Sequence, residues 1–209
     1  MGSEMCIRDS NYTGGLVGLS WCSIENCKIR ADVDASKADG VWNYTGGLAG
    51  VMRGHHLGAT GDDEHIHIEI KDSQYDGNVH GGICHAYQGG SSSIGHSSTG
   101  RLIGYSLGAN TSSCTAQGKV NSTIGKQTES FQTYYTIGGA FGCIRHENAK
   151  SDVEVNNNRV YVKVNEGIKP IKDFCRVGWL AGVAPEEVRD QEANNTMEII
   201  PTNFDKVGE

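Results

Sequence analysis

The stretch Thr13-Gly14-Gly15-Leu16-Val17-Gly18 decides how the rest of this 209-residue chain is organised, because versions of it recur along the sequence. The nearest copy is Thr45-Gly46-Gly47-Leu48-Ala49-Gly50. Looser copies are Gly81-Gly82-Ile83-Cys84-His85, Gly100-Arg101-Leu102-Ile103-Gly104, Gly138-Gly139-Ala140-Phe141-Gly142 and Gly178-Trp179-Leu180-Ala181-Gly182. Recurrence every few tens of residues predicts a solenoid, in which stacked units bury a shared core. The short interval between Gly81 and Gly100 leaves open which of the two begins a coil.

Polar and apolar residues alternate after the glycine motifs, and this period of two predicts strands with one buried face. The clearest case in the second unit is the segment from His65 to Lys71, and Arg159 to Val164 is another. In the first unit the residues predicted to point inward are Cys27, Ile29, Ala31, Val33 and Ala35, and those predicted to point outward are Lys28, Arg30, Asp32 and Asp34. Cys114 precedes Val120 by the same interval as Cys27 precedes Val33, so we expect the two sulfurs to share one inward slot.

Composition and motif order together predict the fold class. The chain has 29 glycines and only 3 prolines, which is typical of short strands joined by frequent turns. Every unit enters with the same motif in the same direction, which favours parallel stacking over hairpins. We therefore predict an all-β protein, a parallel β-helix of about six irregular coils over residues 11–184. Pro185 followed by acidic residues predicts a short capping helix, so residues 185–209 are expected to form a capping segment and a tail.

The charge balance limits the partners of the protein. The net charge is -7 and Lys and Arg do not cluster, so we expect neither nucleic acid binding nor attraction to an anionic membrane. No apolar run approaches the length of a membrane span, so membrane insertion is not expected. The seven cysteines fit no zinc-site spacing; buried thiols are the preferred interpretation and disulfides the alternative.

Gly14-Gly15-Leu16-Val17-Gly18 followed by Ser23-Ile24-Glu25-Asn26-Cys27 resembles the GLUG repeat of large secreted or surface-anchored bacterial proteins. The resemblance implies a right-handed β-helix, a location outside the cell or on its surface, and an adhesin-like structural role without catalytic residues. Residues 3–10 resemble the translation product of a sequencing adapter, which is common in metagenomic assemblies. We therefore expect residues 1–10 to be an artefact or a disordered leader, and the repeat array to be interrupted at its start.

Two groups of residues are candidates for ligand or metal binding. Tyr134 and Tyr135, with His55 and His56, fall in polar loops, where binding residues usually lie, and the tyrosine rings suit stacking on sugars. His65, His67 and Glu69 would share one face of a strand and could hold a divalent metal, the only cofactor that the sequence suggests. The competing interpretations are that the rings pack against the solenoid and that the histidine strand is a solvated polar face.

Three functions remain open at this point. The preferred one is a structural and adhesive module that presents polar loops to a glycan or protein partner. The second is a polysaccharide hydrolase or lyase, with catalytic residues drawn from Asp32, Asp34, His65, His67 and Glu69 on neighbouring coils. The third is a self-assembling filament or phage-tail component that associates through the solenoid ends.

Overall fold

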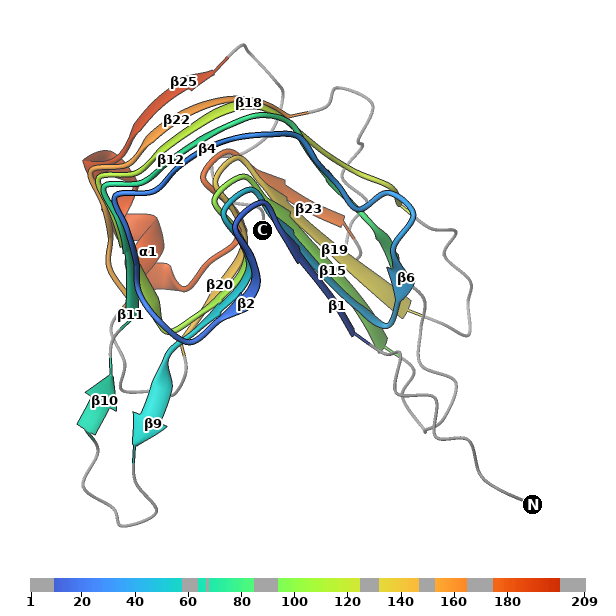
Figure 1. The fold of residues 1–209 in the computed structure, drawn as a ribbon, viewed down its shortest axis with the longest axis horizontal. Coiled ribbons are helices and arrows are strands. Elements are labelled where there is room, and N and C mark those ends of the chain that lie inside the picture. The colour runs from blue at the N-terminus through green and yellow to red at the C-terminus, as the bar shows by residue number, and fades with distance from the viewer. Residues whose placement is uncertain are drawn as a thin grey trace.

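The computed structural model describes residues 10–57, 64–66, 68–84, 94–124, 132–146, 153–164 and 175–199. Over these ranges the chain winds into a parallel β-solenoid that curls in cross-section like a half-open barrel (Figure 1). Each of the first four coils runs through four sheets in turn, which we call A, B, C and D, and in the fifth coil two short helices take the place of the sheet C strand. The predicted parallel β-helix is therefore confirmed.

The four sheets stack equivalent strands of successive coils in parallel. Sheet A contains β1 (Ser10–Gly14), β7 (Trp42–Gly46), β15 (Ile94–Gly100), β19 (Gln132–Gly138) and β23 (Cys175–Gly178). Sheet B contains β2 (Val17–Ser20), β8 (Ala49–Arg53), β16 (Ile103–Leu107), β20 (Phe141–Arg145) and β24 (Ala181–Val183). Sheet C contains β3 (Ile24–Glu25), β11 (Ile68–Lys71), β17 (Ala109–Ser112) and β21 (Val155–Asn156). Sheet D contains β4 (Lys28–Arg30), β5 (Val33–Asp34), β12 (Gln74–Asp76), β13 (Val79–Gly81), β18 (Thr115–Ser122), β22 (Arg159–Val164) and β25 (Thr196–Ile199).

The register of sheet A settles where coils begin. Gly14, Gly46, Gly100, Gly138 and Gly178 align at the ends of five successive strands. Gly81 instead lies in β13, which pairs with β5 and β18 of sheet D. The described residues therefore form five coils, and the glycine pair at Gly81 is an extra turn within the second coil rather than the start of a sixth. A short parallel pair, β6 (Asp39–Gly40) with β14 (Ile83–Cys84), follows sheet D on the way back to sheet A.

The glycine motif is the sharp turn from sheet A to sheet B, where backbones of neighbouring coils meet. A Cβ on Gly104 would lie 2.6 Å from the Thr45 nitrogen and 2.7 Å from the Gly50 oxygen. These are backbone atoms that cannot rotate away, so only glycine fits. Beyond this contact the two sheets diverge like the arms of a V (Figure 1).

A second corner, which recurs in each of the first four coils, joins sheets C and D. Asn26, Asp72, Ser113 and Asn157 occupy equivalent positions there, with φ between 48° and 56°. Asn and Asp tolerate this left-handed conformation better than most residues. The residue that follows each of them turns inward, and Cys27 and Cys114 both align with Ser73 because Lys28, Gln74 and Thr115 are in register. The predicted shared sulfur slot is thus confirmed.

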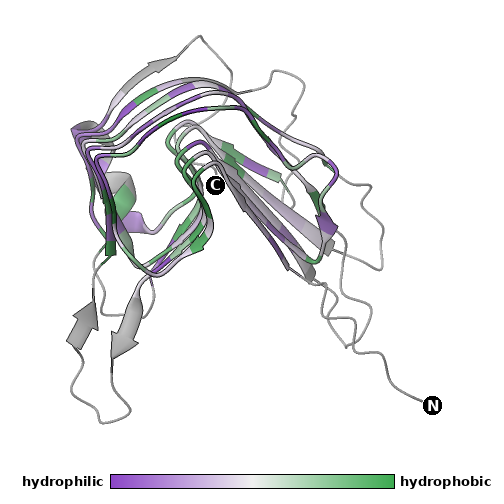
Figure 2. Cartoon of the chain, viewed as in Figure 1, coloured by the Kyte–Doolittle hydropathy of each residue, from purple (hydrophilic) through white to green (hydrophobic). Residues whose placement is uncertain are grey.

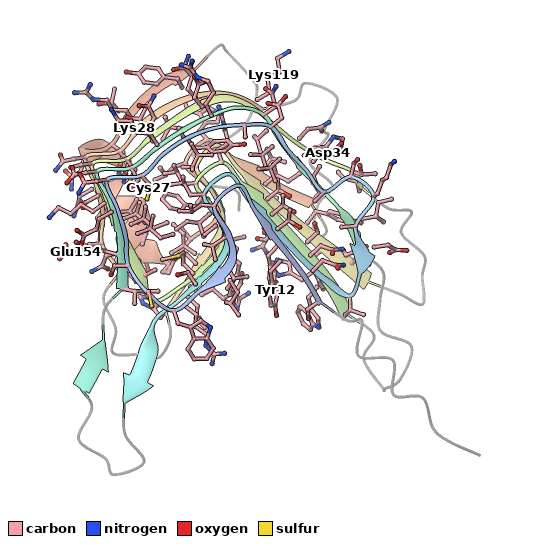
Figure 3. The ribbon with its side chains drawn as sticks, in the orientation of Figure 1. Tyr12, Cys27, Lys28, Asp34, Lys119 and Glu154 are labelled. Atoms are coloured by element: carbon pink, nitrogen blue, oxygen red, sulfur yellow. The ribbon has the colours of Figure 1, made fainter. Side chains whose placement is uncertain are left out.

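The core lies between the four sheets and is built largely from ladders of aliphatic side chains, with Ile137 and Val177 contributed by sheet A. Val33, Val79 and Val120 stack in sheet D, and Ile68 and Ile70 of sheet C are 2% and 0% exposed. Figure 2 shows hydrophobic residues concentrated on sheets B and C and hydrophilic residues along sheet D. Figure 3 shows Cys27 pointing inward, while Lys28, Lys119, Asp34 and Glu154 point away from the interior.

Two local predictions were wrong in instructive ways. Ala31 is exposed rather than inward, because the predicted strand is interrupted between β4 and β5 and the alternation is lost there. The segment from His65 to Lys71 is not one strand. Its first part belongs to β10 (Glu64–Ile66), which forms an antiparallel hairpin with β9 (His55–Leu57), and its second part is β11 in sheet C. Periodicity along the chain does not reveal where a strand leaves one sheet for another.

The predicted C-terminal cap is present and also extends the solenoid. Helix α1 (Glu186–Asp190) and the 3-10 helix η1 (Gln191–Asn194) follow sheet B of the last coil. The Gln191 side chain accepts a hydrogen bond from the Val155 nitrogen and donates one to the Val153 oxygen, so it satisfies the edge of sheet C. Strand β25 then pairs with β22, so sheet D continues past residue 184, where we predicted that the solenoid would end. No helix in the described ranges combines the length and apolar character needed to cross a membrane.

The cysteines are mostly core residues. Among the six in the described ranges, none forms a disulfide, and Cys84, Cys114, Cys143 and Cys175 are buried. Burial raises the pKa of the Cys84 thiol to about 11 and that of Cys114 to about 12. These thiols are therefore protonated at neutral pH and unreactive. The interpretation of the cysteines as buried thiols is confirmed for these four.

Candidate ligand-binding groove

A groove of about 500 Å³ lies in the V between sheets A and B. It extends across several coils, with Trp42 and Tyr44 from the second coil at one end and Arg176 and Val183 from the fifth at the other. Three strand spacings of about 4.8 Å give this stretch a length of about 14 Å along the solenoid axis. The lining residues are Trp42, Tyr44, His96, Tyr105, Tyr134, Tyr135, Thr136, Cys143, Arg145, Arg176 and Val183.

The sheet A wall is made by two ladders of side chains that the parallel register aligns. In one ladder Trp42, His96 and Tyr134 occupy equivalent positions. The other ladder runs through Tyr12, Tyr44, Ser98, Thr136 and Arg176. Residues two apart on a strand point to the same side, so both ladders face the groove.

The sheet B wall is also a ladder, and it changes character along the axis. Leu19, Val51, Tyr105, Cys143 and Val183 are in register. Two residues further along the strands, Arg53, Leu107 and Arg145 align at the open rim. Arg53 itself lies over the ring of Trp21, 5.3 Å from its centroid. The wall is thus apolar near the turn and cationic at its mouth.

The aromatic rings form a continuous stack between the two walls. The Tyr12 and Tyr44 rings are 5.7 Å apart and nearly parallel at 6°, and the Tyr44 and Tyr105 rings are 4.7 Å apart at 23°. His96 meets both Tyr44 and Tyr105 edge-on, at 5.7 Å and 6.2 Å. Tyr12, at the end of the stack, is 41% exposed and points into the space between β1 and β2 (Figure 3).

Burial keeps most of the groove's titratable groups neutral. It raises the pKa of Tyr44 well above that of a free phenol and also raises the pKa of Tyr105, with smaller effects from neighbouring groups. Burial also raises the pKa of the Cys143 thiol. The pKa of His96 is lowered to about 4, first by burial and then by the charge of Arg145. At neutral pH the groove therefore offers uncharged hydrogen-bonding groups on aromatic rings, and among its described lining residues the charged side chains are Arg145 and Arg176.

The lowered pKa of His96 predicts an acid-sensitive component of stability. The unfolded chain binds a proton at His96 below about pH 6.5, whereas the folded protein does so only near pH 4, so stability is lost as the pH falls through this window. We expect a loss of about 1–3 kcal/mol, measured by urea unfolding at pH 7 and pH 4. The variant His96→Gln should lack this component. An identical pH dependence in the wild type and the variant would show that His96 is not its source.

Residues 9–34 match the family model of the GLUG motif. The first coil of the chain therefore carries a GLUG motif. The matched segment corresponds to one coil, from β1 through the glycine turn and the Asn26 corner to β5. No curated protein and no solved structure matches the chain.

The GLUG coil geometry explains what the motif residues do. Its glycines form the turn that brings sheets A and B together, its Asn26 takes the left-handed corner, and its Cys27 fills the inward slot. The groove lies outside these positions. It is built by side chains just before the turn, such as Trp42 and Tyr44, and just after it, such as Tyr105.

The two tyrosines predicted to bind ligand both border the groove but differ in orientation. Tyr134 is partly buried and belongs to the groove-facing ladder with Trp42 and His96. Tyr135 is 1% exposed, and its hydroxyl donates to the Cys84 oxygen and accepts from the Cys84 nitrogen, which ties sheet A to β14. His55 and His56 lie in β9, opposite Ile66 and His65 of β10, and their side chains lie outside the described part of the structure.

The residues predicted for metal binding or catalysis fall in different sheets. Glu69 lies in β11 of sheet C, His65 lies in the β9–β10 hairpin, and His67 is outside the described residues. Asp32 and Asp34 instead belong to the sheet D side of the first coil. The Asp32 carboxylate accepts a hydrogen bond from the Asn78 nitrogen at 2.7 Å, and the Asp34 carboxylate accepts one from the Ser36 nitrogen at 2.9 Å. Within the described ranges no three His, Cys, Asp or Glu side chains come close enough to hold a metal ion.

Several groove residues were missed by sequence reasoning. Tyr44, His96, Tyr105 and Arg145 are distant in sequence and are brought together only by the stacking of coils. A partial signal was present, because Asn11-Tyr12-Thr13 and Asn43-Tyr44-Thr45 repeat a tyrosine at the same distance before the glycine turn. That tyrosine faces the groove in both coils.

Proposed function

We propose that this protein is a rigid β-solenoid module that binds a glycan in the groove between sheets A and B. The observation that carries the proposal is the aromatic lining of the groove walls, in which the Tyr44 and Tyr105 rings stack and Tyr12 extends the stack beyond the groove's end. Sugar rings pack their apolar faces on aromatic rings, while phenol hydroxyls reach the sugar hydroxyls.

The shape of the groove supports a chain-like ligand. Its lining residues come from four successive coils, so the binding surface repeats along the solenoid axis as the units of a polysaccharide repeat along their chain. Both walls are made of paired strands, so a ligand would meet a surface held by the sheets, which favours binding because less entropy is lost. The partly exposed ring of Trp42 lies at the N-terminal end of the groove and that of Tyr12 one coil beyond it, so a ligand would reach these two rings first.

The proposal predicts that Trp42→Ala weakens glycan binding without unfolding the protein. The Trp42 ring is 38% exposed and lines the groove, so its loss removes a stacking surface rather than a core residue. We expect a loss of about tenfold in affinity, corresponding to about 1.4 kcal/mol, measured by calorimetry with an oligosaccharide first identified on a glycan array. The array is run with and without EDTA, and new reducing ends are monitored.

Tyr161→Ala is the matched control, because Tyr161 is a partly exposed tyrosine of sheet D and lies outside the groove. It should leave the affinity unchanged. An array without any bound glycan, or an equal loss in both variants, would contradict the assignment of the groove as a glycan site. Binding that requires metal or releases new reducing ends would favour a hydrolase or lyase instead.

A further inference from the structure

The groove carries two arginines that the aromatic stack does not account for. Arg145 ends β20 on the sheet B wall, and Arg176 lies in β23 on the sheet A wall, in the adjacent coil. Both side chains are exposed, and both line the groove. A ligand lying between the walls would therefore meet a guanidinium on each side.

Within the part of the chain that the structure describes, no carboxylate pairs with either arginine. Among the described residues the groove lining contains no Asp or Glu; Asp76 pairs with Arg30, and the Glu187 carboxylate contacts the His146 ring. Glu187 follows the last strand of sheet B by a few residues, and its carboxylate contacts His146 rather than Arg145. The protein as a whole carries a net charge of -7, so a groove lined by two arginines differs in charge from the rest of the molecule.

Building on the proposed glycan-binding function, we propose that the groove selects an anionic glycan, whose acidic substituents Arg145 and Arg176 bind while its sugar rings pack on the tyrosines. A guanidinium presents donors in a fork that matches a carboxylate or sulfate, and such charge-assisted hydrogen bonds are stronger than neutral ones. The arginines occupy the fourth and fifth coils and the exposed rings of Tyr12 and Trp42 the first and second. An elongated ligand would therefore place its acidic groups toward the C-terminal end of the groove.

The two arginines also favour an anionic oligosaccharide over the other ligands that the groove could bind. Neutral sugars need no cations, and a second copy of this chain would bring a predominantly acidic but irregular surface rather than a narrow repeating one. A carboxylated or sulfated oligosaccharide supplies both requirements, namely ring faces for stacking and regularly spaced anions. Carboxylated and sulfated oligosaccharides differ in their acidic group and can be distinguished by binding measurements.

The test is calorimetry of the full chain with three oligosaccharides of equal length: an oligogalacturonate, a sulfated glycan and a neutral glucan. We expect at least one anionic oligosaccharide to bind at least tenfold more tightly than the glucan, and the preference to shrink as salt is raised. Arg145→Gln and Arg176→Gln should each lower the affinity for that oligosaccharide about tenfold and lower the affinity for the glucan much less. Arg159→Gln removes an exposed arginine of sheet D and should change nothing.

The outcomes separate this inference from the proposed function. If the glucan binds as tightly as both anionic oligosaccharides, or if the two groove variants bind like the wild type, the anionic selectivity is wrong and glycan binding stands. If none of the three binds, nor any glycan on the array, the proposed function is wrong and the inference fails with it. Thermal unfolding of each variant checks that the exposed substitutions leave the fold intact, and native mass measured in parallel shows whether a second copy occupies the groove.

Discussion

Gly104→Ala is expected to abolish cooperative folding of the solenoid. The added Cβ would lie 2.6 Å from the Thr45 nitrogen and 2.7 Å from the Gly50 oxygen, far inside normal contact distance. Because these atoms belong to strands held in place by the neighbouring coils, the clash can be relieved only by separating sheets A and B. We expect a cost above about 4 kcal/mol, a large share of the stability of a typical domain. Urea or thermal unfolding followed by circular dichroism measures it.

Leu16→Ala is the control for Gly104→Ala. Leu16 belongs to the same kind of turn in the first coil, but its side chain is 44% exposed. Its truncation should cost less than about 1 kcal/mol. If Gly104→Ala unfolded with the stability of the wild type, the close approach of the two sheets at this turn would be wrong.

Ile68→Asp is expected to have the second large effect. Ile68 is 2% exposed and its strand lies between β3 and β17 in sheet C, so the new carboxylate would be buried without a cation. A buried unpaired charge costs several kcal/mol, through either desolvation or forced protonation. We expect loss of the cooperative thermal transition at neutral pH.

Lys71→Asp tests the same strand on its exposed face. Lys71 lies three residues from Ile68 on the opposite side of β11 and is exposed, so the same acidic side chain would remain in water there. Its effect should be within about 0.5 kcal/mol. Equal stability of the two aspartate variants would contradict the inward assignment of Ile68.

The repeated turn and the alternating strands were sufficient to predict the fold from sequence. Both signals are local, since a glycine motif and a period of two can be recognised within one unit. The same local information could not fix the number of coils. Gly81-Gly82 looks like a coil start in sequence, but its strand joins sheet D, and this depends on pairing with β5 and β18.

Departures from the motif show what a single sequence leaves hidden. Arg101 replaces the second glycine of the third coil, and its side chain crosses the core with 0% exposure. Its guanidinium donates to the Tyr161 and Gly77 oxygens and lies 5.8 Å from the centroid of the Tyr75 ring. Burial lowers its pKa to about 10, so it remains charged at neutral pH.

The absence of a side chain at Gly118 leaves space for the buried Arg101 guanidinium. Gly118 has a φ of 119°, and a Cβ there would lie 2.6 Å from the Arg101 Nη2 atom. The two residues are distant in sequence, and no motif connects them. Their relation, like the assembly of Tyr44, His96, Tyr105 and Arg145 around the groove, becomes visible only when the coils are stacked.

The central claim is that the ligand occupies the groove between sheets A and B, and the fluorescence of Trp42 tests it most directly. Trp42 lines the groove, and the other two tryptophans, Trp21 and Trp179, are not among the lining residues. With Trp21 and Trp179 replaced by Phe, the emission of Trp42 should change as the anionic oligosaccharide is added and saturate at the affinity found by calorimetry. Full calorimetric binding with no change in Trp42 emission would place the ligand elsewhere and contradict the account.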